Sequence, residues 1–206
     1  DGQLTKSCLS QWWMEDFYSI ADTYLCMEQY MMAGKAQLFG DEERCKEILE
    51  CSDPKQIKAL GRKVRGFDQK VWDLLDDLKE TLAQANGVGL AAPQVGILRR
   101  AVIVMDENFE PMELVNPEIL AQEGEQNGLE GCLSVPGLWG YVKRPEWVKV
   151  RAFDRNGNAF EVEGTGLTAR CFCHELAHLD GHLYTELTDR LYDSDELDEL
   201  MEENEK

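Results

Sequence analysis

The sequence is poor in cationic residues and has no long apolar run. Lys and Arg number 21 against 40 Asp and Glu, which gives the 206-residue chain a formal net charge of −19. Because non-specific nucleic-acid binding needs a cationic surface, we expect no direct contact with nucleic acid. No apolar stretch approaches the roughly 20 residues that cross a bilayer as a helix, so we also expect no membrane span.

Features of a secreted protein are lacking as well. Residues 1–6 do not contain the apolar core of a signal peptide. Without such a signal, seven cysteines are typical of a compartment that keeps thiols reduced, and their odd number needs no explanation. The sequence therefore predicts a cytoplasmic protein with reduced thiols.

The order of hydrophobic patterns predicts an α+β fold. Apolar residues at helical spacing fill residues 68–85, and a second, mostly buried helix is predicted at 166–179. Strand candidates lie between the two helices, at 101–105, 112–115, 147–153 and 159–163. A helix, several antiparallel strands and a helix, in that order, favour an α+β fold over a βαβ alternation.

The end of the chain is strongly acidic. Residues 189–206 contain nine Asp and Glu against Arg190 and Lys206. A run of this kind is usually a solvated or frayed helix, and a docking tail for a basic partner is the alternative.

The residues most suited to chemistry lie in a cysteine turn and a histidine helix. His174 and His178 stand four residues apart, so they share one face of the predicted helix and both imidazoles can reach one metal ion. Glu175 can carry protons to and from a water molecule at an open coordination position. Cys132, in a predicted polar turn, can add a thiolate, which is a strong ligand for borderline metals.

Other interpretations of these residues stay open at this level. Cys171 lies one turn before His174 on roughly the same face, so the two cysteines and two histidines could form a closed structural zinc site without chemistry. Cys132 alone could be a buried structural cysteine. An extended metalloprotease motif needs a third His at the position of Tyr184, and His182 is predicted to lie at the surface.

A glycine-rich segment at 87–96 follows the first predicted helix. It lacks the Gly-x-Gly-x-x-Gly spacing and the Lys-Ser/Thr pair of phosphate loops. Glycine lets a backbone approach a ligand closely, and the Gln94 amide can hold a carbonyl oxygen as negative charge develops on it. Taken alone, the segment is more typical of a turn than of a ligand-binding or catalytic site.

Three segments together resemble the peptide deformylase family in order and spacing. They are Gly87-Val-Gly-Leu-Ala-Ala-Pro-Gln94, Glu130-Gly-Cys-Leu-Ser134 and His174-Glu-Leu-Ala-His178. The resemblance covers roughly residues 62–188. It implies antiparallel strands around a central His-Glu-x-x-His helix, and a hydrolase that removes the N-formyl group from the N-terminal methionine of newly made polypeptides.

The resemblance also implies a metal cofactor. Cys132, His174 and His178 would hold one divalent ion, most often Fe²⁺, with Zn²⁺, Ni²⁺ and Co²⁺ as alternatives. Glu175 would take a proton from the attacking water and pass it to the leaving amine. The partners implied are formyl-methionyl nascent polypeptides, with a transient contact to the ribosome.

Further roles follow from the same resemblance. The Gln94 side-chain amide and the Leu133 backbone N–H would hold the developing oxyanion. Val88, Gly89 and Cys171 would border the methionine pocket, which gives Cys171 an apolar role in place of a ligand role.

The sequence departs from the family in two places. The usual extended segment with a Gly-Asp-Pro-x-Leu-Arg-like motif is not found before the first helix, and only Arg62-Lys63-Val64 is faintly similar to it. We expect its loss to leave a sheet edge or a core face uncovered. Ala177 stands where many family members carry Asp, which we expect to affect stability before catalysis.

The N-terminal part resembles a different family. The stretches that carry this resemblance are Cys8-Leu-Ser-Gln-Trp-Trp13, Met27-Glu-Gln-Tyr-Met-Met-Ala33, Lys35-Ala-Gln-Leu-Phe39 and Leu60–Trp72. Through them, residues 8–72 are similar to the first half of a NADAR domain, a family associated with cleaving N-glycosidic bonds in ADP-ribose-like or riboflavin-pathway compounds. Glu28 matches an acidic residue implicated in catalysis there. The second half is absent, so we expect no glycosidase activity, because half a domain cannot close its own core.

These resemblances divide the chain into three parts. We expect a partial NADAR-like segment at 1–66, a deformylase-like catalytic domain at 67–188 and an acidic tail at 189–206. The alternatives to a deformylase are an N-glycosidase acting through the N-terminal segment and a metal-binding protein without catalysis.

Overall fold

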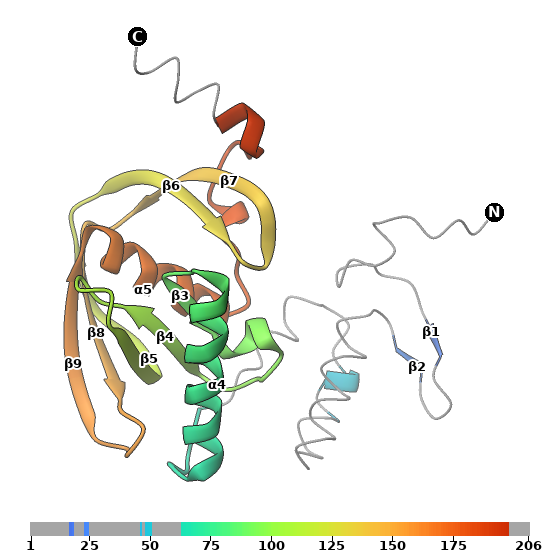
Figure 1. The fold of residues 1–206 in the computed structure, drawn as a ribbon, viewed down its shortest axis with the longest axis vertical. Coiled ribbons are helices and arrows are strands. Elements are labelled where there is room, and N and C mark those ends of the chain that lie inside the picture. Colours follow the sequence, from blue (N-terminus) through green and yellow to red (C-terminus); the bar gives the residue numbers. More distant parts are fainter. Residues whose placement is uncertain (1–16, 19–22, 25–45, 47, 51–62, 198–206) are drawn as a thin grey trace.

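The computed structural model describes residues 17–18, 23–24, 46, 48–50 and 63–197 (Figure 1). Strands β1 (Phe17–Tyr18) and β2 (Thr23–Tyr24) pair in an antiparallel manner. Glu28, most of the NADAR-like segment and the last part of the acidic tail lie outside the described residues. Within the described ranges, none of the helices combines the length and the apolar character needed to cross a membrane.

Helix α4 (Gln69–Ala85) confirms the first predicted helix to within one residue. It begins where the Asp68 side chain accepts a hydrogen bond from the Lys70 N–H, and it ends at Asn86, whose left-handed backbone closes the last turn. One apolar face is buried, formed by Val71, Leu74, Leu75, Leu78 and Leu82. Helical spacing of these residues explains why the sequence predicted this element.

The strands form a five-stranded antiparallel sheet and a separate hairpin. The sheet has the order β3-β4-β5-β8-β9, and the hairpin pairs β6 with β7. Their bounds are β3 Gly89–Ala91, β4 Ala101–Met105, β5 Pro111–Glu123, β6 Gln126–Cys132, β7 Val135–Arg144, β8 Trp147–Phe153 and β9 Ala159–Thr165. The part of the chain around these strands also contains 3₁₀ helices η2 (Ala92–Val95) and η3 (Tyr184–Glu186) and helix α5 (Gly166–Leu179).

The predicted α+β order is confirmed, with differences in the strands. β4, β8 and α5 have the predicted bounds, and β9 is two residues longer than predicted. β5 continues well beyond the expected 112–115, and β3, β6 and β7 were not predicted. The hairpin strands carry several glycines, which obscure the alternation that marks a strand in a sequence.

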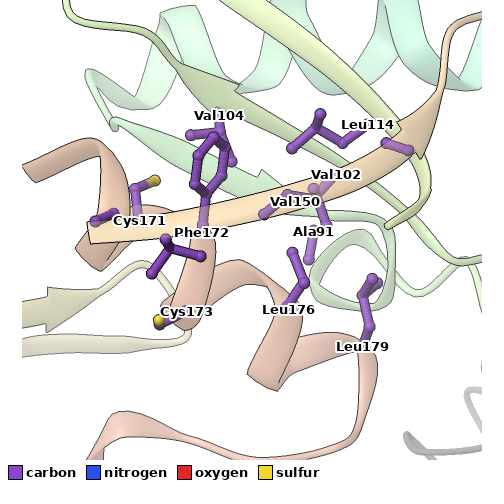
Figure 2. Packing of buried hydrophobic residues seen from close by; sticks show 13 residues of the cluster. Ala91, Val102, Val104, Leu114, Val150, Cys171, Phe172, Cys173, Leu176 and Leu179 are labelled. Atoms are coloured by element: carbon purple, nitrogen blue, oxygen red, sulfur yellow. The ribbon is translucent and has the colours of Figure 1, made fainter. Parts of the chain in front are cut away.

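Helices α4 and α5 pack on opposite faces of the sheet and create two cores. Alternate residues of β4 point to the two sides, with Val102 and Val104 in the α5 core and Ala101 and Ile103 in the α4 core. Figure 2 shows Phe172 and other α5 side chains facing the sheet residues of the first core. α5 is therefore held in place by a fully buried apolar face.

The segment before α4 covers part of the core face that the sequence led us to expect exposed. Val64 is buried in the α4 core, and Phe67 packs against Phe153 with ring centroids 5.7 Å apart. The Asn116 side chain fixes Val64, since its Oδ1 accepts from the Val64 N–H at 2.7 Å and its Nδ2 donates to the Val64 carbonyl at 2.8 Å. The side-chain amide thus makes the bonds that a neighbouring strand would make.

Asn116→Ala is expected to lower the free energy of unfolding by about 2–4 kcal/mol, because it removes both bonds and leaves an alanine at a left-handed φ of 51°. Asn116→Gly removes the same bonds but tolerates that backbone, so it should cost about 1 kcal/mol less. Urea denaturation of both variants measures the difference. Unchanged stability in both would show that Val64 is not held through this amide.

Candidate active site

The cysteine sulfur and both imidazoles predicted as metal ligands lie together. Cys132 Sγ is 3.2 Å from His178 Nε2, and the His174 and His178 rings are 4.9 Å apart at 79°. The ligand atoms of all three residues lie within 4.8 Å of one another. Cys132 is the last residue of β6, so the turn predicted around it begins only at the next residue.

The fourth residue of the closed-site alternative is not part of this group. The Cys171 thiol donates a hydrogen bond to the Val88 carbonyl at 3.2 Å. Burial, with nearby Glu175 adding to it, raises the pKa of the Cys171 thiol well above its usual value, which keeps the sulfur protonated. His182 is on the surface as predicted, where it contacts Glu186. The geometry therefore favours three ligands over four.

Glu175 lines the same cavity as Cys132 and His174, and its carboxyl group has one oxygen without a partner. Among the described residues, its Oε2 is the buried side-chain oxygen or nitrogen that has no hydrogen-bond partner. Burial raises its pKa to about 7, against the opposing effect of His174 and together with that of Glu130. A β-carbon at Gly89 would lie 2.5 Å from Glu175 Oε1 and from Cys171 Sγ, so only glycine fits there.

The donor set and the unpartnered oxygen fit a hydrated divalent ion. One sulfur and two imidazole nitrogens are ligands of borderline metals, and three protein ligands leave a position for water. Burial lowers the pKa of His174, but contacts with Cys132 and Glu130 outweigh it and raise the value to about 10. The surroundings of the His174 imidazole thus favour a positive charge beside Cys132 and Glu130.

A buried ionic network lies behind His174. Glu130 Oε2 accepts from His174 Nδ1 at 3.0 Å, and its two oxygens also accept two hydrogen bonds from Arg144, at 2.9 and 3.0 Å. Arg170 adds a bond to Glu130 at 2.8 Å and another to the Val142 carbonyl at 2.9 Å. Burial raises the pKa of Glu130, but the hydrogen bonds from His174 and Arg144 outweigh it and lower the value to about 2.

Sequence reasoning missed this network. From the sequence, Glu130 was named only as part of a family motif, and no role was assigned to Arg170 in the predicted helix at 166–179. The signal was a cation within the apolar first half of the predicted helix, because a buried Arg needs an acidic partner.

The Gln94 amide is oriented by its neighbours. Its Oε1 accepts from the Ala91 N–H at 2.8 Å, so its Nε2 faces Ser134 Oγ at 3.2 Å and Cys132 Sγ at 3.7 Å. The segment from Gly87 to Gly96, taken alone as a turn, is instead strand β3 followed by η2. Leu133 follows Cys132 in the hairpin turn.

These side chains surround one cavity of about 490 Å³. The predicted site residues that line it are Val88, Gly89, Gln94, Cys132, Leu133, Cys171, His174 and Glu175. His178 does not line the cavity, but its buried imidazole lies beside Cys132, with Nε2 3.2 Å from Cys132 Sγ. A cysteine sulfur, two imidazoles and a buried glutamate side chain, gathered at one cavity, are the groups found in the site of a metal-dependent hydrolase.

Comparison with known proteins identifies the family. Residues 45–193 match the family described as Polypeptide deformylase, and because this is more than half of the sequence, the chain belongs to that family. A second family, described as NADAR domain, matches residues 2–85 and overlaps the first match. Both resemblances seen in the sequence are thereby confirmed.

Individual relatives agree with this assignment. Peptide deformylase from Acetivibrio thermocellus is 51% identical over 146 residues, which are 71% of this chain and 85% of that protein. Peptide deformylase 1 from Bacillus subtilis is 50% identical over 145 residues, 70% of this chain and 91% of that protein. The crystal structure of peptide deformylase from Thermotoga maritima is similar with a TM-score of 0.61 and 35% identity, covering 64% of this chain and 89% of that one.

Proposed function

We infer that this chain is a peptide deformylase, a metal-dependent hydrolase that removes the N-formyl group from the N-terminal methionine of newly made polypeptides. The observation that carries this function is the cluster of Cys132, His174 and His178 beside the unpartnered carboxylate of Glu175, in a chain of the polypeptide deformylase family. No observation on the described residues favours an N-glycosidase.

We propose Cys132, His174 and His178 as the ligands of the metal, and Fe²⁺ as the ion. When bound, a divalent ion supplies Lewis acidity and lowers the pKa of a water molecule. Glu130 supports the ligand set because it accepts from His174 Nδ1, which leaves His174 Nε2 free to bind. The mixed sulfur and nitrogen set also accepts Zn²⁺, Ni²⁺ and Co²⁺.

Glu175 is the proposed proton carrier. Its carboxylate accepts a proton from the attacking water and delivers it to the amine nitrogen as the C–N bond breaks, since an amide nitrogen leaves only when protonated. The environment that raises its pKa to about 7 suits both directions of transfer near neutral pH.

Oxyanion and substrate contacts complete the proposed site. The Gln94 Nε2–H and the Leu133 backbone N–H are donors for the oxygen that gains negative charge. Gln94 is already oriented for this by its bond to the Ala91 N–H. Val88, Gly89 and Cys171 form the proposed wall for the methionine side chain.

The wider setting follows from the substrate. Since nascent polypeptides are acted on, we place the activity in the cytoplasm and propose a transient contact with the ribosome. We further propose that residues 67–188 form the catalytic domain, preceded by a NADAR-derived segment at 1–66 and followed by an acidic tail at 189–206.

The purified chain, loaded anaerobically with Fe²⁺ or Ni²⁺, is expected to deformylate formyl-Met-Ala-Ser. Release of formate measures the reaction, and metal analysis should find one ion per chain. Removal of the ion with 1,10-phenanthroline should abolish turnover, and fresh Fe²⁺ should restore it. Metal binding without formate release from a folded chain would contradict the proposed function and favour a metal-binding protein without catalysis.

A further inference from the structure

The chain that follows α5 returns across strand β7 and contacts three consecutive residues of it (Figure 1). The Tyr184 hydroxyl, on a ring that is almost completely buried, donates to the Leu138 carbonyl at 2.8 Å. Trp139 and Tyr192 form an antiparallel bridge, in which each N–H donates to the other carbonyl at 2.9 and 2.8 Å. Thr188 fills the space beside the next residue, because a β-carbon at Gly140 would lie 2.7 Å from its Cγ2.

The middle residue of the three faces the catalytic cavity. Trp139 lines the cavity, and its indole lies directly over Gly131, where a β-carbon would be 2.7 Å from the indole nitrogen. Gly131 immediately precedes the proposed ligand Cys132. Within the described part of the chain, the indole N–H forms no hydrogen bond, so this donor is available to a molecule bound in the cavity.

The segment that follows α5 is also held by contacts of its own side chains, Tyr192 and Arg190. The Tyr192 ring meets Tyr141 edge-on, with centroids 6.2 Å apart, and the Arg190 guanidinium lies 4.6 Å above the Tyr192 ring. Arg190 also pairs with Glu196 at 3.0 Å. These contacts fix the segment against β7, so the position of Trp139 is set by residues more than 40 positions further along the chain.

Trp139 belongs to β7, whereas the proposed methionine contacts come from the residues leading into and beginning β3 and from α5. A cavity of about 490 Å³ has the size of sites for drug-sized ligands and extends beyond one methionyl side chain. The substrate is a peptide, so its second and third residues must leave the site along another part of this cavity. Trp139 offers an aromatic face and a free donor there, which suit a peptide backbone.

We propose that the segment Tyr184–Tyr192 is a positioning element for substrate binding, which holds Trp139 against the part of the peptide that follows methionine. The proposal rests on the deformylase function and assigns to this segment the recognition of longer substrates. It acts through Trp139 and does not touch the reacting atoms.

Steady-state kinetics of the metal-loaded full chain test the proposal, with formyl-Met and formyl-Met-Ala-Ser as substrates. Tyr192→Pro removes the N–H that donates to the Trp139 carbonyl, whereas Tyr192→Ala loses the same ring but keeps both backbone bonds. For the tripeptide, KM should rise roughly threefold to tenfold more in the proline variant than in the alanine variant, as expected for one lost hydrogen bond. For formyl-Met, both variants should keep kcat and KM within about twofold.

A double-mutant cycle with Trp139→Ala separates positioning from general damage. If the segment acts through Trp139, Tyr192→Pro should have no further effect on the tripeptide KM once the indole is gone. Equal losses for the two substrates, or additive effects in the cycle, would overturn the proposal. Absence of turnover by the unaltered chain with either substrate would instead overturn the deformylase function, and this inference with it.

Discussion

Replacing Glu175 with Gln is expected to lower kcat for formyl-peptide hydrolysis by about 10²- to 10⁴-fold, because the amide cannot accept and return a proton. The change keeps the size and shape of the side chain. It also removes a carboxylate whose Oε2 is buried without a partner, so the folded state should not lose stability. The loss is therefore expected in kcat alone, with metal content and thermal stability preserved.

Formate release under saturating substrate measures the effect, and metal analysis and thermal unfolding serve as checks. Glu118→Gln is the matched control, since Glu118 is an exposed carboxylate of β5 outside the cavity lining. A Glu175→Gln variant that retains more than about one tenth of kcat would mean that another group carries the proton.

Replacing Glu130 with Gln should be the most destabilising change in the site. Arg144 and Arg170 are each 8% exposed and share this one carboxylate, so the substitution leaves two buried cations without their counter-charge. Breaking a buried pair in this way costs about 3–5 kcal/mol in the free energy of unfolding. Because Glu130 also orients His174, metal affinity should fall by about 10- to 100-fold.

Urea denaturation and competition with a chelator measure the two effects. Glu161→Gln provides the matched control, because its ion pairs with Arg151 and Lys149 lie at the surface and should each contribute no more than about 1 kcal/mol. Similar stability of the two variants would show that the buried arginines find other partners.

The same carboxylate gives stability a defined pH dependence. Its folded-state pKa of about 2 lies below the ordinary value of 4.5, so its contribution is complete above about pH 4.5 and is lost as the pH falls toward 2. The unaltered chain should therefore lose stability more steeply over this interval than Glu130→Gln does.

The sequence predicted those elements whose pattern is set locally. α5 was predicted with its bounds because apolar residues surround the helix and Asp180-Gly181 stops it. β4 was predicted because a strand buried on both faces is a continuous apolar run. The proximity of His174 and His178 was predictable because residues four apart on a helix share a face, whatever the rest of the fold does.

The unpredicted parts depend on contacts between distant residues. Gly128 lies in β6 as glycine because the Arg170 guanidinium occupies the space of a side chain, and Gly131 is glycine because the Trp139 indole does the same. In β6, these two glycines interrupt the alternation of apolar and polar residues. The roles of Glu130 and Trp139 likewise become visible only when α5, the hairpin and the C-terminal segment are brought together.

Strand β4 is buried on both faces, and this affects how the active-site residues are held in position. α4 and α5 use opposite faces of this one strand, so neither helix can detach without exposing a fully apolar surface. The two cores are thus expected to open as one cooperative unit and not as separate layers. The relative position of His174 and His178 therefore depends on the stability of the whole domain. A substitution that weakens the packing of α4 would disturb the two histidines although α4 lies on the opposite face of the sheet.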